Sequence, residues 1–187
     1  TAADPDAGTT LSFTLSGADA AKFQLAGTGN SRTLSFVTTP NFEAPTDEGR
    51  NNVYDVTVAV SDGALSAAQP IAVTVTNVNE APSVTLNRTI TVNSGQSVAL
   101  SNALLLATDP EQSAGSLTYT VTTGPTHGTL TKNSAAVTTF KQSDLKASDT
   151  TSNAIRYTTT GIAGQTDSFV LSLSDGTNTV TNITVNV

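Results

Sequence analysis

The sequence contains no cysteine, methionine or tryptophan, and aromatic residues make up only 5% of its 187 residues. Without cysteine, no disulfide can stabilise the fold. With so few aromatic residues, each hydrophobic core must be small and built from Val, Leu and Ile. Eukaryotic extracellular domains of this size often carry disulfides, so the combined absence of these three residue types resembles the composition of large bacterial surface proteins.

Charge of either sign is also scarce, and basic residues are scarcer than acidic ones. Charged residues make up 12% of the chain, with 15 acidic against 8 basic side chains and a net charge of −7. No run of Lys or Arg is present that could hold a nucleic acid or an anionic membrane surface. No apolar run approaches the length of a membrane span. The charge balance therefore favours divalent cations as partners.

The residue types that catalysis needs do not form a recognisable constellation. His127 is the only histidine, and no cysteine, second histidine or nucleophile motif accompanies it, so we assign it to turn packing. A glycosidase needs two acids facing one cleft, usually among aromatic sugar platforms, and this chain has no tryptophan and three tyrosines. The sequons at Asn87 and Asn182 are read as chance matches in a chain of bacterial composition. We therefore predict that the protein is not an enzyme.

Alternation of apolar and polar residues marks short strands along the whole chain. In the first half the clearest examples are 11–15, 54–60 and 71–75. In the second half we expect opening strands around Ile90 and Val92 and around Val98 and Leu100, followed by later strands that end at 167–174 and 180–187. Gly, Asp, Asn and Ser clusters separate them, which is the turn chemistry of hairpins and Greek-key connections. Short helical turns are expected only at 18–22 and 141–145.

This pattern predicts an all-β protein of two tandem antiparallel Greek-key β-sandwiches, the general architecture of immunoglobulin-like domains. The expected domains are residues 1–82 and 83–187. The first domain is expected to lack its opening strand, because no strand precedes Asp4, whereas two precede Asp109. The chain is thus expected to be a fragment of a longer array, and an unpaired sheet edge is expected in its first domain.

Acidic groups recur at matching places in the two halves. Asp62 follows the Asp4-Pro5-Asp6 group by 58 residues from Asp4, and Asp175 follows the Asp109-Pro110-Glu111 group by 66 residues from Asp109. Asp-Gly alone is an ordinary turn dipeptide. Its pairing with an Asp-Pro-acid loop in both halves, next to the linker 75–82, favours sites for a hard cation between successive domains.

These motifs resemble two related families. Residues 3–82 resemble a bacterial cadherin-like repeat, through Ala3-Asp4-Pro5-Asp6, Asn41-Phe42-Glu43, the strand 54–62 and the closing stretch 73–82. Residues 83–187 are similar to the cadherin-related repeat of chondroitin sulfate proteoglycans, through the turn 125–130, the stretch 140–145, Ile155-Arg156-Tyr157 and the segment 167–176.

The resemblance implies calcium (Ca2+) bound between successive domains. Carried over by motif, its inter-domain ligands are Glu43, Asn77, Asn79, Glu80, Asp109, Glu111 and Asp175. An incomplete half-site at the other end of the first domain consists of Asp4, Asp6 and Asp62. Asn41 and Asn77 stand where an aspartate is usual, which lowers the carboxylate count and implies one or two ions rather than three.

The expected function is a calcium-stiffened spacer or extender segment of a large bacterial adhesin, secreted or at the cell surface. Neighbouring repeats of the same polypeptide are the expected partners, without nucleic acid or membrane insertion, and the fragment itself is expected to be monomeric. Two alternatives stay open. One is an adhesive module that contacts a glycan or protein partner, and the other is a subunit of a surface filament completed by strand addition.

Overall fold

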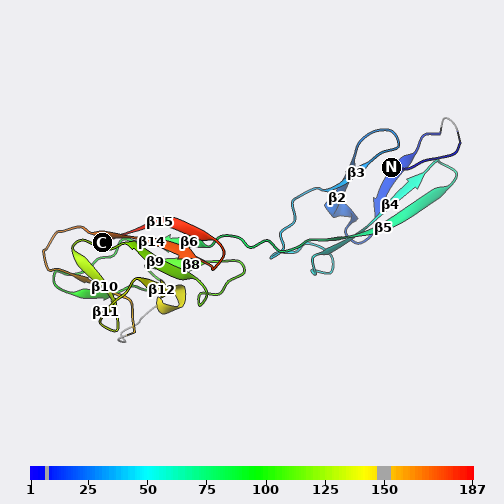
Figure 1. Ribbon diagram of the computed structural model, residues 1–187. Coiled ribbons are helices and arrows are strands. Elements are labelled where there is room, and N and C mark those ends of the chain that lie inside the picture. The colour runs from blue at the N-terminus through cyan, green and yellow to red at the C-terminus, as the bar shows by residue number, and fades with distance from the viewer. Residues whose placement is uncertain (7–8, 147–152) are drawn as a thin grey trace. The chain divides into compact units, whose positions relative to one another are not determined.

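The protein is built from antiparallel strands in two compact units (Figure 1). The computed structural model describes residues 1–6, 9–146 and 153–187. The first unit comprises Thr1–Val78 and the second Asn79–Val187. Within the described ranges there is no α-helix, and no helix has the length and apolar character to cross a membrane. The all-β prediction is confirmed.

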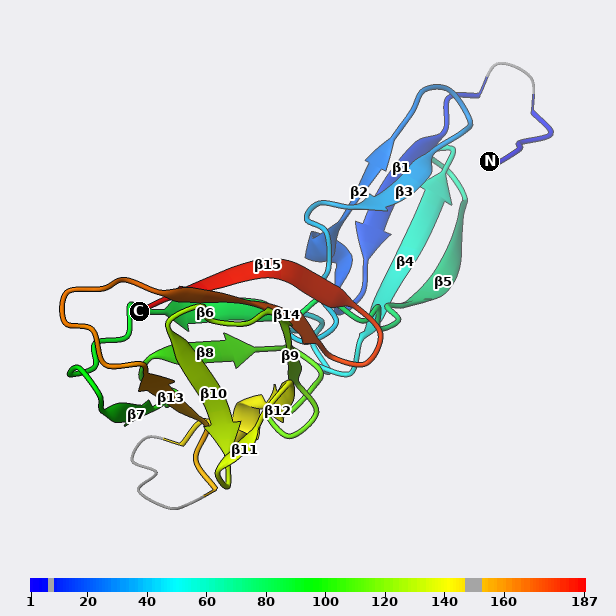
Figure 2. The same ribbon diagram turned by 60° about the vertical axis from the view of Figure 1, so that its left-hand side comes forward.

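The first unit contains a three-stranded sheet and a two-stranded hairpin (Figure 2). The sheet has the order β1-β4-β5, formed by β1 (Ser12–Ser16), β4 (Val53–Ser61) and β5 (Ser66–Thr74). The hairpin pairs β2 (Phe23–Ala26) with β3 (Thr33–Phe36). One 3-10 turn, η1 (Ala20–Lys22), precedes β2 and lies within the segment where a helical turn was expected.

The core of the first unit is small and aromatic. Phe23, Tyr54 and Val56 are its buried members. The rings of Phe23 and Phe36 stack with centroids 4.5 Å apart, and Phe36 meets Tyr54 edge-on at 5.1 Å. Stacked and edge-to-face pairs are the favoured geometries of aromatic rings. The few aromatic residues of this half therefore carry much of its packing.

Buried carboxylates tie the long connection before β4 to the sheet. The Asp19 carboxylate accepts the backbone N–H groups of Glu48 and Asp55, both at 2.8 Å. Asp47 accepts those of Asn51 at 2.8 Å and Asn52 at 3.1 Å. Both aspartates are only 3% exposed. Such bonds compensate for the cost of burying a charge.

The described part of the second unit contains two four-stranded sheets and one further strand pair. The first sheet has the order β12-β9-β14-β15, formed by β9 (Thr118–Thr123), β12 (Thr139–Lys141), β14 (Ser168–Ser174) and β15 (Thr179–Asn186). The second has the order β11-β10-β13-β7, formed by β7 (Ser97–Ala99), β10 (Gly128–Lys132), β11 (Ala135–Ala136) and β13 (Arg156–Thr159). The strand pair joins β6 (Ser83–Asn87) to β8 (Leu105–Thr108), and a 3-10 turn, η2 (Gln142–Asp144), follows β12.

The opening of the second unit differs from the sequence prediction. The first strand is β6, which begins directly after Pro82, and the stretch around Ile90 and Val92 is not a strand. Ile90 still contributes one bond, because its N–H donates to the Asn186 carbonyl at 2.8 Å. Strand β6 contains only two alternating apolar residues, and it follows directly after a linker that ends in proline. Its alternation is therefore too short to predict a strand from the sequence.

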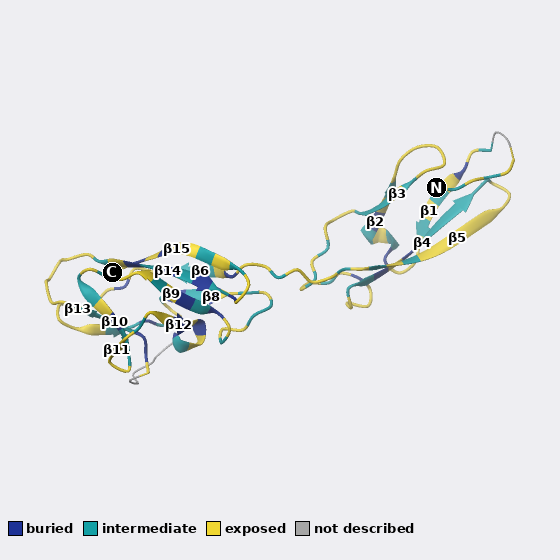
Figure 3. Cartoon of the chain, viewed as in Figure 1, coloured by how far each residue is buried: buried dark blue, intermediate teal, exposed yellow. Residues whose placement is uncertain are grey.

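The second unit buries a much larger apolar cluster, drawn from every sheet (Figure 3). Within it Gln142 is only 3% exposed. Its side-chain oxygen accepts the Ala107 N–H at 2.8 Å and the Tyr119 hydroxyl at 2.9 Å. Burial raises the pKa of Tyr119, which therefore stays a neutral donor. This polar group ties β8 and β9 together inside an apolar core.

Asp167 holds the turn before β10 against the start of β14. Its carboxylate accepts the N–H of Thr126 and of His127, both at 3.0 Å, and the Tyr157 hydroxyl at 2.8 Å. Burial alone would raise the pKa of Asp167, but these bonds outweigh it and lower the pKa to about 2. Burial, together with the bond to Asp167, raises the pKa of Tyr157 to about 12. His127 lies in this turn, as assigned from the sequence.

Replacing Gly128 by alanine should destabilise the second unit by about 1–3 kcal/mol, the usual cost of overpacking. A Cβ on Gly128 would overlap the ring of Tyr157, which is buried and held by Asp167. Gly124→Ala is the matched control, because its Cβ would have no atom within 4 Å. Chemical unfolding of both variants measures the difference. Equal stabilities would contradict this packing.

The Asp167→Asn variant should be less stable than the wild type at pH 5 and nearly as stable as the wild type at pH 2. The folded-state pKa of Asp167 is about 2 and the ordinary value is 3.8, so its contribution is fully present above about pH 4. It is lost as the pH falls through about 2. Melting temperatures measured in chelator between pH 5 and pH 2 should converge for wild type and variant. A constant difference over that range would contradict the proposed role of the carboxylate.

Candidate metal centre

Three segments of the second unit meet where it begins. They are the linker residues Asn79 and Glu80, the loop 109–112 after β8, and the turn 175–178 between β14 and β15. Direct hydrogen bonds join the linker to both other segments. These contacts explain why the second compact unit begins at Asn79, whereas the predicted domain boundary lies after Pro82.

Asp175 closes β14 with a turn that uses one of its two oxygens. Oδ1 accepts the N–H groups of Thr177 and Asn178, both at 2.6 Å. Oδ2 accepts the side-chain amide of Asn79 at 2.8 Å. Burial alone would raise the pKa of Asp175, but the bond from Asn79 and the two backbone bonds lower it. Asp175 is 8% exposed as a residue, and its carboxylate is held in the charged form with lone-pair capacity left on Oδ2.

Asp109 organises the loop after β8 in a similar way. Its Oδ1 accepts the N–H of Glu111 at 2.9 Å and that of Gln112 at 2.8 Å. The Gln112 side-chain amide lies between this carboxylate and Asn79, with its nitrogen 2.9 Å from Asn79 Oδ1. In the alternative orientation the same amide donates to Asp109. Two backbone donors thus fix Oδ1 of Asp109, and the Gln112 amide lies beside the same carboxylate.

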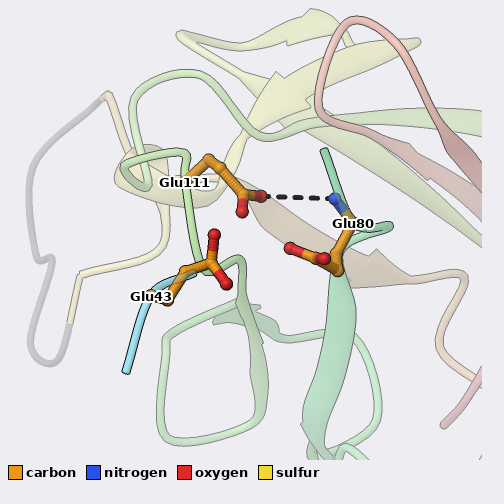
Figure 4. A group of neighbouring side chains, drawn as sticks. All are labelled: Glu43, Glu80 and Glu111. Carbon is orange, nitrogen blue, oxygen red and sulfur yellow. Dashed lines mark hydrogen bonds between the residues drawn. The ribbon is translucent and has the colours of Figure 1, made fainter. Parts of the chain in front are cut away.

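Glu80 and Glu111 bring two further carboxylates together (Figure 4). The Glu80 N–H donates to Glu111 Oε2 at 3.4 Å, and one carboxylate oxygen of each residue lies within 4.8 Å of the other. Two negative charges at this separation repel each other. A cation between them would remove that repulsion. Carboxylate, amide and carbonyl oxygens from separate loops form a donor set suited to calcium, which takes six to eight oxygens in flexible geometry.

The structure therefore brings together the five predicted ligands of the second unit, namely Asn79, Glu80, Asp109, Glu111 and Asp175. The other two, Glu43 and Asn77, belong to the first unit. Both are exposed, and the Glu43 N–H donates to Asn41 Oδ1 at 2.8 Å. Asn41 thus shapes the corner before β4 through its side chain.

The predicted half-site of the first unit also gathers in one place. Asp4, Asp6 and Asp62 line a single cavity of about 220 Å³. The Asp6 N–H donates to Asp4 Oδ1 at 2.7 Å. Oδ1 of Asp62 accepts the N–H of Leu65 at 2.6 Å and that of Ala64 at 2.7 Å, and these bonds lower the pKa of Asp62. This turn has the same bonds as the turn of Asp175.

Two residues that contact the predicted ligands were missed in the sequence. Gln112 lies against Asp109 and Asn79, and Asn178 donates to the carbonyl oxygens of Asn79 and Glu80. Amides carry no charge, so a search for repeated acidic groups passes over them. A comparison of Ser-Asp-Gly-Thr-Asn at 174–178 with Ser-Asp-Gly-Ala-Leu at 61–65 could have singled out Asn178.

Each unit is built from antiparallel strands, and in each an aspartate closes the turn before the last strand. A family model described as cadherin-like matches residues 82–187, and the chain belongs to this family. In fold, the chain is similar to the first two cadherin repeats of human protocadherin-24, with a TM-score of 0.51 and 17% identity. That likeness covers 100% of this chain and 84% of the other.

Relatives in sequence are large animal matrix proteins. The chain is 29% identical over 119 residues to the mouse extracellular matrix organizing protein FRAS1, an alignment that covers 64% of this chain and 3% of the relative. It is 30% identical over 138 residues to extracellular matrix protein 3 of the sea urchin Lytechinus variegatus, covering 71% of this chain and 4% of the relative. The chain thus matches only a few per cent of the length of these relatives.

Proposed function

We propose that this chain is a calcium-dependent spacer segment within a longer extracellular protein. The observation that carries the proposal is the meeting of Asp109, Glu111 and Asp175 with the linker residues Asn79 and Glu80. Each carboxylate sits at the end of a strand or in the loop that follows it. An ion bound there would join the linker to two loops of the second unit. The role is mechanical and includes no catalytic step.

The donor set is richer in amides than a set built from carboxylates alone. Asp175 offers Oδ2, since its Oδ1 already accepts two backbone N–H groups. Asp109 offers Oδ2 for the same reason. We expect one or two ions, bound with the modest affinity of extracellular calcium modules, about 10⁻⁴–10⁻³ M. Glu43 and Asn77 are proposed as additional ligands from the first unit.

The location proposed is outside the cell, as the names of the two matrix relatives suggest. The composition, with no cysteine, methionine or tryptophan, is the support for a bacterial surface protein as the source. Repeats stacked end to end hold a distant binding domain away from a surface. Neighbouring repeats of the same polypeptide are then the partners of both ends, with Asp4, Asp6 and Asp62 as the ligands offered to a preceding repeat.

Calcium should raise the melting temperature of the second unit, and the double variant Asp109→Ala, Glu111→Ala should abolish most of that rise. At about 100 times the dissociation constant, an ion that binds only the folded state stabilises it by about 2.7 kcal/mol. For a unit of this size the rise is on the order of 10 °C. Calorimetry with calcium and then with chelator measures it. No difference between the two conditions would overturn the proposal.

Two variants complete that experiment. Asp144→Asn is the control, because Asp144 pairs with Lys132 at 2.9 Å, so its loss should leave the calcium-dependent rise intact. Glu43→Gln tests the share of the first unit. A smaller rise in Glu43→Gln supports a ligand from that unit, and a full rise assigns the ion to the second unit alone.

A second candidate function rests on an opening in the first unit. A cavity of about 390 Å³ lies over the sheet and the hairpin, lined by apolar residues that include Phe13, Leu25, Leu34, Val58 and Ile71. Among the described residues β3 pairs only with β2, and β5 only with β4. The matching strands of the second unit have further neighbours, since β13 also pairs with β7, and β15 accepts a bond from Ile90.

We therefore keep strand addition as the alternative, in which a strand of a second copy completes the first unit. Pro70 lies in the edge strand β5 and lacks an N–H, so it opposes pairing there, and of these two strands β3 is the more open edge. Light scattering over a hundredfold range of concentration distinguishes the two functions. Assembly that grows with concentration supports the filament subunit, and a constant monomer mass supports the spacer.

A further inference from the structure

The side chain of Asn178 bonds directly to the linker. Its Nδ2 donates to the carbonyl oxygens of Asn79 and Glu80, both at 3.1 Å. The Glu80 carbonyl also accepts the side-chain amide of Asn79 at 2.9 Å. That amide in turn donates to Asp175 Oδ2 at 2.8 Å. Two NH₂ groups thus each bridge two oxygen atoms, as a cation would.

This arrangement saturates the Glu80 carbonyl, because a carbonyl oxygen has two lone pairs and both meet an amide donor. The Asn178 amide is neutral, so it adds no charge to a site that already holds several carboxylates. The backbone N–H of Asn178 is bound to Asp175 Oδ1 at 2.6 Å, so the turn itself places this residue beside the linker. The bonds of the side chain to the linker involve only atoms of the protein itself.

The first unit supplies an internal comparison. In both turns the serine hydroxyl bonds the carbonyl four residues on, and the aspartate accepts two backbone N–H groups. Leu65 occupies the place that Asn178 holds in the second unit, and it is 77% exposed. The turn thus forms equally well with leucine. The amide of Asn178 is not needed to build the turn, and its bonds go to the linker.

We infer that Asn178 is a positioning residue, an amide clamp that fixes Asn79 and Glu80 against the second unit in the absence of calcium. The linker at this end is then held in two ways. The amide clamp acts at all times, and any ion adds to it by binding the carboxylates. This inference stands whether or not the proposed calcium site is correct. It predicts that chelation loosens this end of the linker only in part.

Cleavage by a glutamate-specific protease after Glu80 in the full 187-residue chain tests the inference. The segment must leave its partners to enter the protease, so the cleavage rate reports how often it opens. In chelator, Asn178→Asp, which keeps the size of the side chain but has no N–H to donate, should be cut on the order of tenfold faster than wild type. Asn178→Leu, which places at this position the leucine found in the first unit, should be cleaved faster by a similar factor. Cleavage after Glu48, in the first unit, is the internal reference.

Leu65→Asn is the control variant and should leave the rate at Glu80 unchanged. Rates in Asn178→Asp and Asn178→Leu within twofold of wild type in chelator would overturn the clamp. Adding calcium gives a separate result. If calcium fails to slow cleavage in wild type while both Asn178 variants are fast in chelator, the clamp stands and the calcium proposal fails. If calcium protects but the variants match wild type in chelator, the reverse holds.

Discussion

The candidate site depends on one kind of interaction. An aspartate at the end of a strand accepts hydrogen bonds from the backbone N–H groups of the turn that follows it. In the second unit Asp175 uses Oδ1 in this way and keeps Oδ2 for the linker. The turn costs little conformational entropy, because its bonds join residues close together in the sequence. It nevertheless holds a charged oxygen at the end of a sheet. The same turn at Asp62 shows that the device is repeated in the chain.

Both units contain this aspartate turn, but the hydrophobic core behind the turn differs in size between them. The second unit has strands on both sides of its core and buries Tyr157, Phe169 and Leu171 almost completely. The first unit relies on the aromatic contacts of Phe23, Phe36 and Tyr54, and on buried carboxylates that replace apolar packing in its long connection. With no disulfide available, hydrogen bonds to aspartate take over part of the role of holding loops in place.

Much of this was predictable from the sequence, for physical reasons. Alternation located strands such as β4, because a half-buried sheet imposes a period of two, and the repeated Asp motifs located the loops that meet at the linker. The prediction was wrong about the opening of the second unit, since β6 has only two alternating apolar residues. It also missed Gln112 and Asn178. Both residues are neutral amides that bond to segments far away in the sequence. The periodicity of apolar residues carries no information about such contacts.

The central claim is that oxygens held at the start of the second unit bind calcium, and calorimetric titration of calcium into the metal-free chain tests it most directly. The account predicts saturable binding of one or two ions, with a dissociation constant of about 10⁻⁴–10⁻³ M. It also predicts loss of that binding when Asp175 is replaced by asparagine, because Asp175 then has no carboxylate to offer. The absence of saturable heat in the wild-type chain, or equal binding by the Asp175→Asn variant, would contradict it.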